Sequence, residues 1–175
     1  MKYKTHVIGG VCSAVILNQF ILQPNTIEAN IIPCTIVMAG SIVGSLLPDI
    51  DHTQSYLGKR AKIISKPMNS LLGHRGAFHS PFLHFLILSL LFIVGQMSLS
   101  DGLFVLHKYL LSGLAIGIFS HLFLDSLTKA GIPILYPVSK KKVSFMPLTT
   151  GGKGEFVVRI LLYLTIINNV VLFFK

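Results

Sequence analysis

Apolar residues gather into five long stretches along the chain, and polar residues collect in the segments between them. A helix needs about 17–25 apolar residues to cross the hydrocarbon core of a membrane, and each stretch is that long or nearly so. The pattern therefore predicts an all-α protein, a polytopic bundle of about five transmembrane helices that forms a single integral membrane domain over residues 1–175. The predicted spans are residues 7–22, 31–47, 82–99, 103–127 and 156–174.

The composition supports a membrane protein. The chain is 52% hydrophobic and only 12% charged, with a mean hydropathy of +0.72, whereas a soluble domain is typically about a quarter charged. Residues 1–22 also resemble a secretory signal peptide, with a basic start before an apolar run, but no clear Ala-x-Ala cleavage sequence follows. Cys12 lies near the cytoplasmic end of the first predicted span, and Cys34 lies near the outer end of the second. Because they differ in depth, we expect two buried free thiols and no disulfide.

The Lys and Arg residues are distributed unevenly between the two sides that five spans would define. Two precede the first span, five follow the second and five follow the fourth, whereas residues 23–30 and 100–102 contain none. The positive-inside rule then predicts a multi-pass protein with a cytoplasmic N-terminus and a C-terminus outside the membrane. Basic segments beside anionic lipid headgroups account for the net charge of +9, so we expect membrane lipids as partners and no direct binding to nucleic acid.

Potential metal ligands form four clusters, each at the predicted cytoplasmic end of a span. They are His6, then Asp49, Asp51 and His52, then His74, His79 and Ser80, and finally His121 with Asp125. Apart from His6, they fall in two predicted cytoplasmic segments, residues 48–81 and 121–155. Because the predicted topology rests on Lys and Arg alone, the shared depth of these ligands is an independent observation.

The residue types in these clusters indicate a transition metal. His121 and Asp125 are four residues apart on a predicted helix, so both project from one face. An ionisable side chain costs about 2.5–3.5 kcal/mol at the centre of a membrane helix and less near an interface, and a bound cation would offset much of that cost. Imidazole with carboxylate suits Zn, Fe or Mn better than Ca or Mg. The ligands exceed those of one tetrahedral zinc site, which permits two ions, and two-metal sites commonly hydrolyse phosphate esters.

On these grounds we expect a membrane-bound metal-dependent hydrolase that acts at the cytoplasmic face on a phosphoester or lipid-linked substrate. Asp51 is the candidate for general base or bridging ligand. Arg75, supported by Lys129, is the candidate for stabilising charge on the substrate, because a planar guanidinium grips phosphate well. Candidates for positions beside the metal or the substrate are His52, Ser80, Lys129 and Glu155.

Simpler structural roles compete with the metal site, and the sequence leaves them open. The aspartates could cap helix ends or pair with neighbouring lysines, and the histidines could form hydrogen bonds between helices or lie at the interface without a role. The residues concerned are His6, Asp49, Asp51, His52, His84, His121 and Asp125. Arg75 could simply add to the cytoplasmic positive charge. His107 lies at the outer end of its span, and we expect it to be structural.

Several motifs together resemble the YdjM-type family of bacterial inner-membrane proteins, which are described as metal-dependent hydrolases. The motifs are Leu46-Leu47-Pro48-Asp49-Ile50-Asp51-His52, His74-Arg75-Gly76 with His79-Ser80, and His121-Leu122-Phe123-Leu124-Asp125 followed by Thr128, Gly131 and Leu135-Tyr136-Pro137, with Thr5-His6 near the start. The resemblance covers the chain from its start to about Pro137, and the last span matches only in general character.

This resemblance implies a location in the bacterial inner (plasma) membrane and a helical site distantly similar to that of zinc-dependent phospholipases C. Carried over by position, it implies that the metal ligands are His6, Asp49, His74, His79, His121 and Asp125. It also implies that one or two divalent transition metal ions are bound, with zinc as the first choice. The family is further labelled as LexA-binding, a link that the residues neither support nor exclude.

Two other classes of function stay open from the sequence. A metal or ion carrier would use the same ligands, but it should place polar groups near the bilayer midplane, and here they cluster at one face. A non-enzymatic membrane scaffold could bind metal for structural reasons, or a docking protein could bind a cytoplasmic partner through its basic loops.

Overall fold

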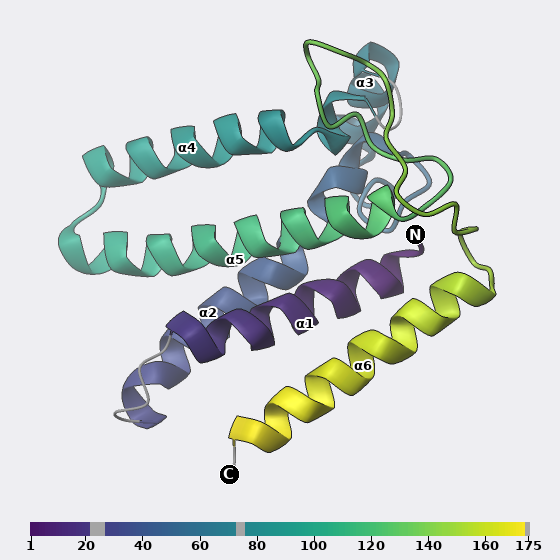
Figure 1. The fold of residues 1–175 in the computed structure, drawn as a ribbon. Coiled ribbons are helices and arrows are strands. Elements are labelled where there is room, and N and C mark those ends of the chain that lie inside the picture. Colours follow the sequence, from purple (N-terminus) through teal and green to yellow (C-terminus); the bar gives the residue numbers. More distant parts are fainter. Residues whose placement is uncertain (22–26, 73–75, 174–175) are drawn as a thin grey trace.

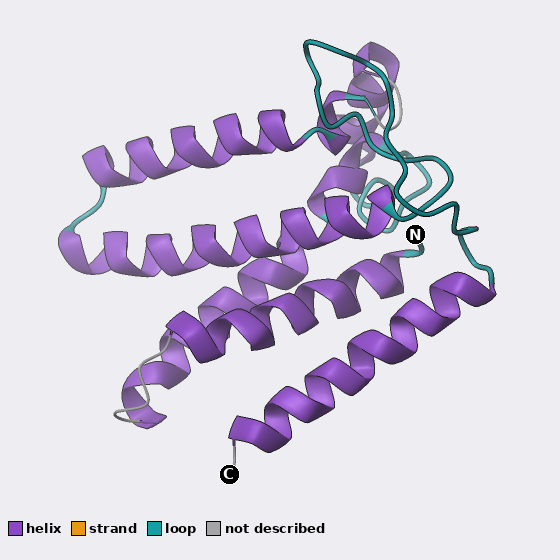
Figure 2. Cartoon of the chain, in the orientation of Figure 1, coloured by secondary structure: helices purple, strands orange, loops and turns teal. Residues whose placement is uncertain are grey.

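The computed structural model describes residues 1–21, 27–72 and 76–173, and its regular secondary structure is helical (Figure 2). The long helices are α1 (Tyr3–Ile21), α2 (Ile27–Gly44), α4 (Pro81–Ser98), α5 (Asp101–Ser126) and α6 (Lys153–Phe173). The short helices are η1 (Leu47–Asp51), α3 (Lys62–Leu72) and η2 (Ala77–His79). The prediction of an all-α membrane bundle is confirmed.

The long helices lie side by side in a bundle with α5 near its centre (Figure 1). α5 contacts α1, α2 and α4, while α6 packs against α1. The start of α1, the short helices η1, α3 and η2 with the described residues around them, and the segment 127–152 all gather at one end (Figure 1). We call this end of the bundle the polar end, because the polar segments of the chain meet there.

Four of the five predicted spans are confirmed as helices that are long and apolar enough to cross a membrane. They are Ile31–Asp51, Pro81–Ser98, Asp101–Ser126 and Lys153–Leu172. The first predicted span forms the helix α1, but α1 is not among the helices whose described residues meet both the length and the apolarity of a span, so this span stays a prediction. Lys4 and His6 near its start and Asn18 and Gln19 near its end lower its mean hydropathy.

Large apolar side chains cover much of the outside of the bundle, including Phe85, Leu90 and Ile93 on α4 and Leu161 and Leu164 on α6. A soluble protein rarely exposes an apolar surface of this extent, whereas a membrane protein presents it to lipid. The buried set contains many polar side chains instead, among them His6, Asp51, His79, His121, Asp125 and Glu155. The bundle is therefore apolar outside and, at the polar end, polar inside.

α2 and α5 approach each other closely through glycine. Gly44 on α2 lies against the backbone of Leu114, and Gly117 on α5 lies against the backbone of Ser41. A Cβ atom at Gly117 would overlap the carbonyl oxygen of Ser41, so this helix separation requires a residue without a side chain. Small residues at helix contacts are the usual means of close packing in lipid, where the hydrophobic effect does not drive helices together.

The segment 127–152 folds over the polar end without forming a regular helix. Two isolated β-bridges shape it, one between Thr128 and Leu148 and one between Ile132 and Val143. Ile132 is buried in a cluster with residues 118 and 122 of α5. The segment therefore covers the last turns of α5 and shields them from solvent.

Gly117→Ala should destabilise the protein by about 1–3 kcal/mol, the usual cost of forcing a methyl group into a packed contact, because α2 and α5 must separate. Gly102→Ala in the same helix is the matched control, since a Cβ there meets nothing within 4 Å and alanine favours a helix over glycine. Denaturant or thermal unfolding in detergent micelles measures the difference. Equal stability of the two variants would contradict the packing of α2 on α5.

Candidate metal centre

Four side chains from three elements meet at the polar end: Asp49 from η1, His79 from η2, and His121 and Asp125 from α5. His79 Nε2 lies 3.5 Å from Asp49 Oδ1 and 3.6 Å from Asp125 Oδ2. His121 Nε2 lies 3.8 Å from each of the same two oxygen atoms. We call these four residues the donor cluster.

The separations within the donor cluster are close to those between the ligands of a small tetrahedral ion. Zinc ligands lie about 2.0–2.2 Å from the metal, which places neighbouring ligand atoms about 3.4 Å apart. The four separations given above are 3.5–3.8 Å. Within the cluster, His79, His121 and Asp125 are close enough to one another to hold one ion, and Asp49 lies within 3.8 Å of both histidines.

A hydrogen bond on its far side orients the ring of His121. Nδ1 donates to the carbonyl oxygen of Ser45 over 2.7 Å, which leaves the lone pair of the neutral ring on Nε2. His121 is fully buried, and its Nε2 has no hydrogen-bond partner among the described residues. A buried polar atom without a partner is costly, and a cation bound at Nε2 would remove that cost.

His79 is flanked by carboxylates on both ring nitrogens. Asp51 Oδ2 lies 3.5 Å from Nδ1, on the ring edge opposite to the Nε2 that faces the donor cluster. Burial alone would lower the pKa of His79, but the nearby carboxylates of Asp49, Asp51 and Asp125 outweigh it, so the pKa is raised above its ordinary value. A carboxylate behind a ligand histidine commonly fixes the ring in metal sites. The position of Asp51 favours this supporting role over the general-base or bridging role expected from the sequence.

His6 joins the donor cluster from α1. Its ring stacks on that of His121 with the centroids 3.7 Å apart, and its Nε2 lies 3.3 Å from Asp125 Oδ1. The amino group of Met1 contacts the same oxygen. Asp125 thus directs Oδ1 toward α1 and Oδ2 toward the other members of the cluster. His6, Asp49 and His121 form a second set of donors close enough to share an ion.

Glu155 anchors the start of α1 to α6. Its Oε1 accepts hydrogen bonds from the backbone N–H of Lys2 over 2.7 Å and from the hydroxyl of Thr5 over 2.5 Å. Its Oε2 accepts from the backbone N–H of Gly151 over 2.6 Å. Glu155 therefore has a structural role, whereas the sequence suggested a position next to the metal or the substrate. By holding the start of α1, Glu155 sets where His6 lies.

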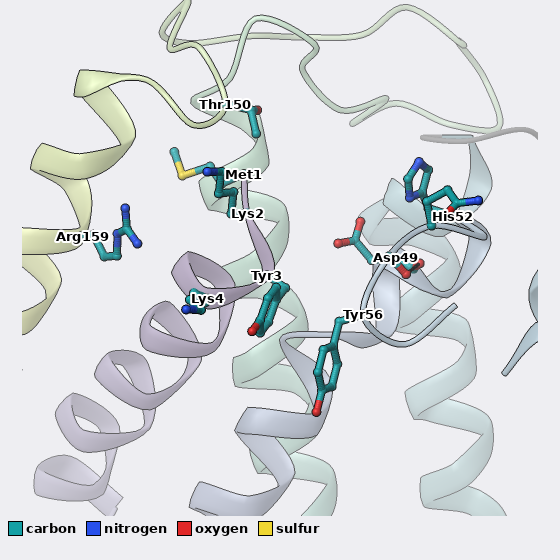
Figure 3. Close-up of a pocket in the computed structure, with 11 residues that line it drawn as sticks. Met1, Lys2, Tyr3, Lys4, Asp49, His52, Tyr56, Thr150 and Arg159 are labelled. Atoms are coloured by element: carbon teal, nitrogen blue, oxygen red, sulfur yellow. Dashed lines mark hydrogen bonds between the residues drawn. The ribbon is translucent and has the colours of Figure 1, made fainter. Parts of the chain in front are cut away.

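A cavity of about 520 Å³ opens beside the donor cluster. Asp49 lines this cavity, and its side chain is 18% exposed, whereas those of His79, His121 and Asp125 are at most 1% exposed. The cluster is therefore reached through Asp49. The cavity is also lined by Lys2, Tyr3, Lys4, His52, Tyr56 and Arg159 (Figure 3).

Most of the side chains that the sequence predicted for the site do lie together: His6, Asp49, Asp51, His79, His121 and Asp125. His74 and Arg75 fall outside the described residues. Ser80 caps α4, where its hydroxyl oxygen accepts the backbone N–H of Phe82. Lys129 is exposed, and its backbone N–H donates to Leu148.

Residues expected to be structural have structural surroundings. The ring of His107 forms a hydrogen bond with the carbonyl oxygen of Leu91 through Nε2. His84, whose role the sequence left open, forms a hydrogen bond through Nε2 with the carbonyl oxygen of Phe78. Cys12 and Cys34 are free thiols, as expected, but only Cys12 is buried and Cys34 is partly exposed.

Sequence reasoning missed the cationic lining of the cavity. Lys2 and Lys4 counted only toward the topology, and no motif connects them with Arg159. The signal that could have found Arg159 is its place in a span, because an arginine within apolar membrane sequence is costly and commonly functional. Nothing in the sequence indicates that the second turn of α6 faces the start of α1.

The fold and the buried cluster define a class of protein: a polytopic helical membrane protein with histidine and aspartate side chains gathered at one end. The chain belongs to the YdjM inner membrane protein family, whose model matches residues 1–174. The family predicted from the motifs at the polar end is thus confirmed.

Two relatives illustrate the extent of this similarity. The chain is 40% identical over 101 residues to the inner membrane protein YdjM of Escherichia coli (strain K12), which covers 58% of this chain and 49% of that protein, so the match spans about half of that relative. It is 32% identical over 156 residues to the uncharacterized protein YvsG of Bacillus subtilis (strain 168), covering 89% of this chain and 85% of that protein. No solved structure matches the chain significantly.

Glu155→Gln should destabilise the protein by about 2 kcal/mol, because an amide loses charge-assisted hydrogen bonds and turns a donor toward a buried backbone N–H. Asp101→Asn, an acid-to-amide change at the opposite end of the bundle, is the control and should cost little. Thermal unfolding in detergent micelles compares the two variants with the parent protein. If Glu155→Gln unfolds at the same temperature as the parent protein, the carboxylate of Glu155 does not hold α1 to α6.

Proposed function

We propose that this protein is a membrane-bound, metal-dependent hydrolase whose donor cluster holds zinc and whose substrate is a phosphoester. The observation that carries the proposal is the cluster itself, in which the two imidazoles each lie 3.5–3.8 Å from the two carboxylates in a largely buried position. Gathering such groups away from water costs free energy unless they are paired or bind a metal. A divalent cation would compensate both carboxylates at once.

The chemistry of the donors supports zinc. Imidazole and carboxylate together suit Zn, Mn or Fe, and a four-donor arrangement of this size suits zinc. His6, Asp49 and His121 form a second set of donors close enough to share an ion. We therefore propose one or two ions per chain.

Zinc, when bound, supplies Lewis acidity that activates water near neutral pH. The side chains of the protein hold the donors in place for this chemistry. The carbonyl oxygen of Ser45 fixes the ring of His121, and the carboxylate of Asp51 lies behind His79. Asp49 stands between the buried donors and the cavity, where a substrate can approach.

The opening at Asp49 favours an enzyme over a scaffold with structural metal. Structural zinc sites are closed by four protein ligands, whereas catalytic sites keep a position open to substrate. A cavity of about 520 Å³ touches one donor of this cluster, and its size lies within the range of small-molecule sites. A structural ion would have no need of such an approach.

The location of the cluster favours an enzyme over a carrier. A carrier is expected to bind its ion near the bilayer midplane, but the donor cluster lies at the polar end of the bundle. We infer that this end faces the cytoplasm. Every described Lys and Arg except Lys108 lies at the polar end or in the first two turns of α6, as the positive-inside rule predicts for a cytoplasmic side.

His121→Gln should abolish the zinc content of the purified protein, because it removes a buried donor that the Ser45 carbonyl holds in place. Inductively coupled plasma mass spectrometry of the full chain in detergent gives the metal-to-protein ratio. His107→Gln on the same helix is the matched control and should keep the zinc of the parent protein. Equal zinc in both variants, or no metal in the parent protein after purification and zinc loading, would refute the metal centre.

Asp49→Asn should lower the hydrolysis of p-nitrophenyl phosphate and bis(p-nitrophenyl) phosphate about 100-fold or more, because metal and substrate meet at this carboxylate. The release of p-nitrophenolate by zinc-loaded protein measures the rate, and Asp101→Asn is the control. Retention of the parent rate in Asp49→Asn would assign the activity to a contaminant. A parent protein that holds zinc but cleaves neither ester would be a structural metal protein.

A further inference from the structure

The cavity beside the donor cluster carries more positive than negative charge. Its lining includes the cationic side chains of Lys2, Lys4 and Arg159 and one acidic side chain, Asp49. In Figure 3, Arg159 extends from α6 toward the start of α1, while Asp49 lies on the other side of the space. An anion in the cavity would therefore lie between three cations and the approach to the donor cluster.

Within the described parts of the chain, no carboxylate forms an ion pair with these three cations, Lys2, Lys4 and Arg159. The nearby acids have other partners, since Asp125 contacts Met1 and the cluster histidines, and Glu155 accepts from backbone N–H groups and a hydroxyl. The positive charge of the cavity is thus available to a ligand.

The cavity also lies beside the exposed apolar surface of α6. Arg159 is flanked on α6 by Phe156, Val157 and Ile160, whose side chains are exposed and face lipid in a spanning helix. Tyr3 and Tyr56 line the cavity and stack with their ring centroids 4.9 Å apart. Tyrosine and arginine near the end of a span are typical of the headgroup region of a bilayer.

We propose that this cavity binds the phosphate monoester headgroup of an anionic membrane lipid. Lys2, Lys4 and Arg159 neutralise the headgroup, and Asp49 marks where its phosphorus meets the donor cluster. This inference rests on the proposed function and names the substrate class of the same site. Three uncompensated cations suit a phosphate monoester, which carries close to two negative charges at neutral pH.

In the net reaction, water adds across the ester bond between phosphorus and the lipid oxygen. The oxygen of water bonds to phosphorus as that ester bond breaks, and the lipid alcohol gains a proton. The products are inorganic phosphate and a neutral lipid alcohol, so no oxidant or second substrate is needed. The neutral alcohol keeps its acyl chains and returns to the bilayer, while the phosphate leaves through the aqueous mouth of the cavity.

The test is the binding of three probes to the full chain in detergent, measured by isothermal titration calorimetry. The probes are dioctanoyl phosphatidic acid, dioctanoyl phosphatidylcholine and inorganic phosphate. Phosphatidic acid should bind most tightly, and Arg159→Gln should weaken its binding about tenfold or more, because it removes charge-assisted hydrogen bonds to phosphate. Lys153→Gln, in the same helix but outside the cavity lining, is the matched control and should change binding less than about twofold.

Lys4→Gln is a second cavity variant that keeps the test decisive if Arg159→Gln fails to fold. This variant should also weaken the binding of phosphatidic acid, while its thermal unfolding should match that of the parent protein. Equal affinities of the cavity variants and Lys153→Gln would overturn the proposal. Inorganic phosphate binding as tightly as phosphatidic acid would assign the cavity to soluble phosphate and overturn the lipid, and equal binding of phosphatidylcholine would overturn recognition of the phosphate monoester.

The zinc content of the same samples separates this inference from the proposed function. If the parent protein lacks zinc but binds phosphatidic acid through Arg159, the hydrolase is wrong and the headgroup site stands. If the protein holds zinc and cleaves soluble phosphoesters while Arg159→Gln binds phosphatidic acid like the parent protein, the hydrolase stands and the headgroup site is wrong.

Discussion

The carboxylate of Asp125 is buried in the last turn of α5, and the burial of that charge constrains everything around it. An ionised group in a dry interior must find opposite charge or hydrogen bonds nearby. Asp125 contacts the amino group of Met1 and Nε2 of His6 through Oδ1, and its Oδ2 faces His79 and His121. Met1 precedes α1, and the histidines come from α1, η2 and α5. One buried charge thus requires the start of the chain and three helices to meet at one point.

The close contact of α2 and α5 fixes the orientation of the donors. Gly44 lies against the backbone of α5, and the next residue, Ser45, offers the carbonyl oxygen that receives the Nδ1 proton of His121. Gly117 lies one turn before His121 and presses against α2 in the same way. A wider separation of the helices would break the Ser45–His121 hydrogen bond, and the ring would no longer be held with Nε2 toward the cluster. The packing of α2 on α5 in the apolar part of the bundle thus controls the orientation of the His121 ring at the polar end.

Local spacing and topology were enough to predict which residues gather, but not how they divide their roles. His121 and Asp125 share a helix face by their spacing, and the distribution of Lys and Arg places the remaining clusters at the same depth. Residue types alone do not show that Asp51 lies behind His79, because that depends on the path of η1 and η2. From the sequence alone, Glu155 is predicted to be a further carboxylate of the site. Only the structure shows that its oxygen atoms accept backbone N–H groups. The apolar stretch at the start of the chain predicts a span, and polar residues at both ends lower the mean hydropathy of α1. The helix is therefore not among the described candidate spans, and this span stays a prediction.

The cavity links the buried donors with the surface that faces lipid. Burial excludes bulk water from His79, His121 and Asp125, and only Asp49 among the donors reaches the cavity to any extent. Arg159 breaks an exposed apolar surface on α6, where facing the acyl chains would be costly. That cost falls if the guanidinium turns into a headgroup-lined cavity, because lipid phosphates supply the missing negative charge. The membrane would then provide both the partner that compensates Arg159 and the molecule presented to Asp49. This accounts for a cationic cavity beside the donor cluster in which Lys2, Lys4 and Arg159 form no ion pair with a described carboxylate.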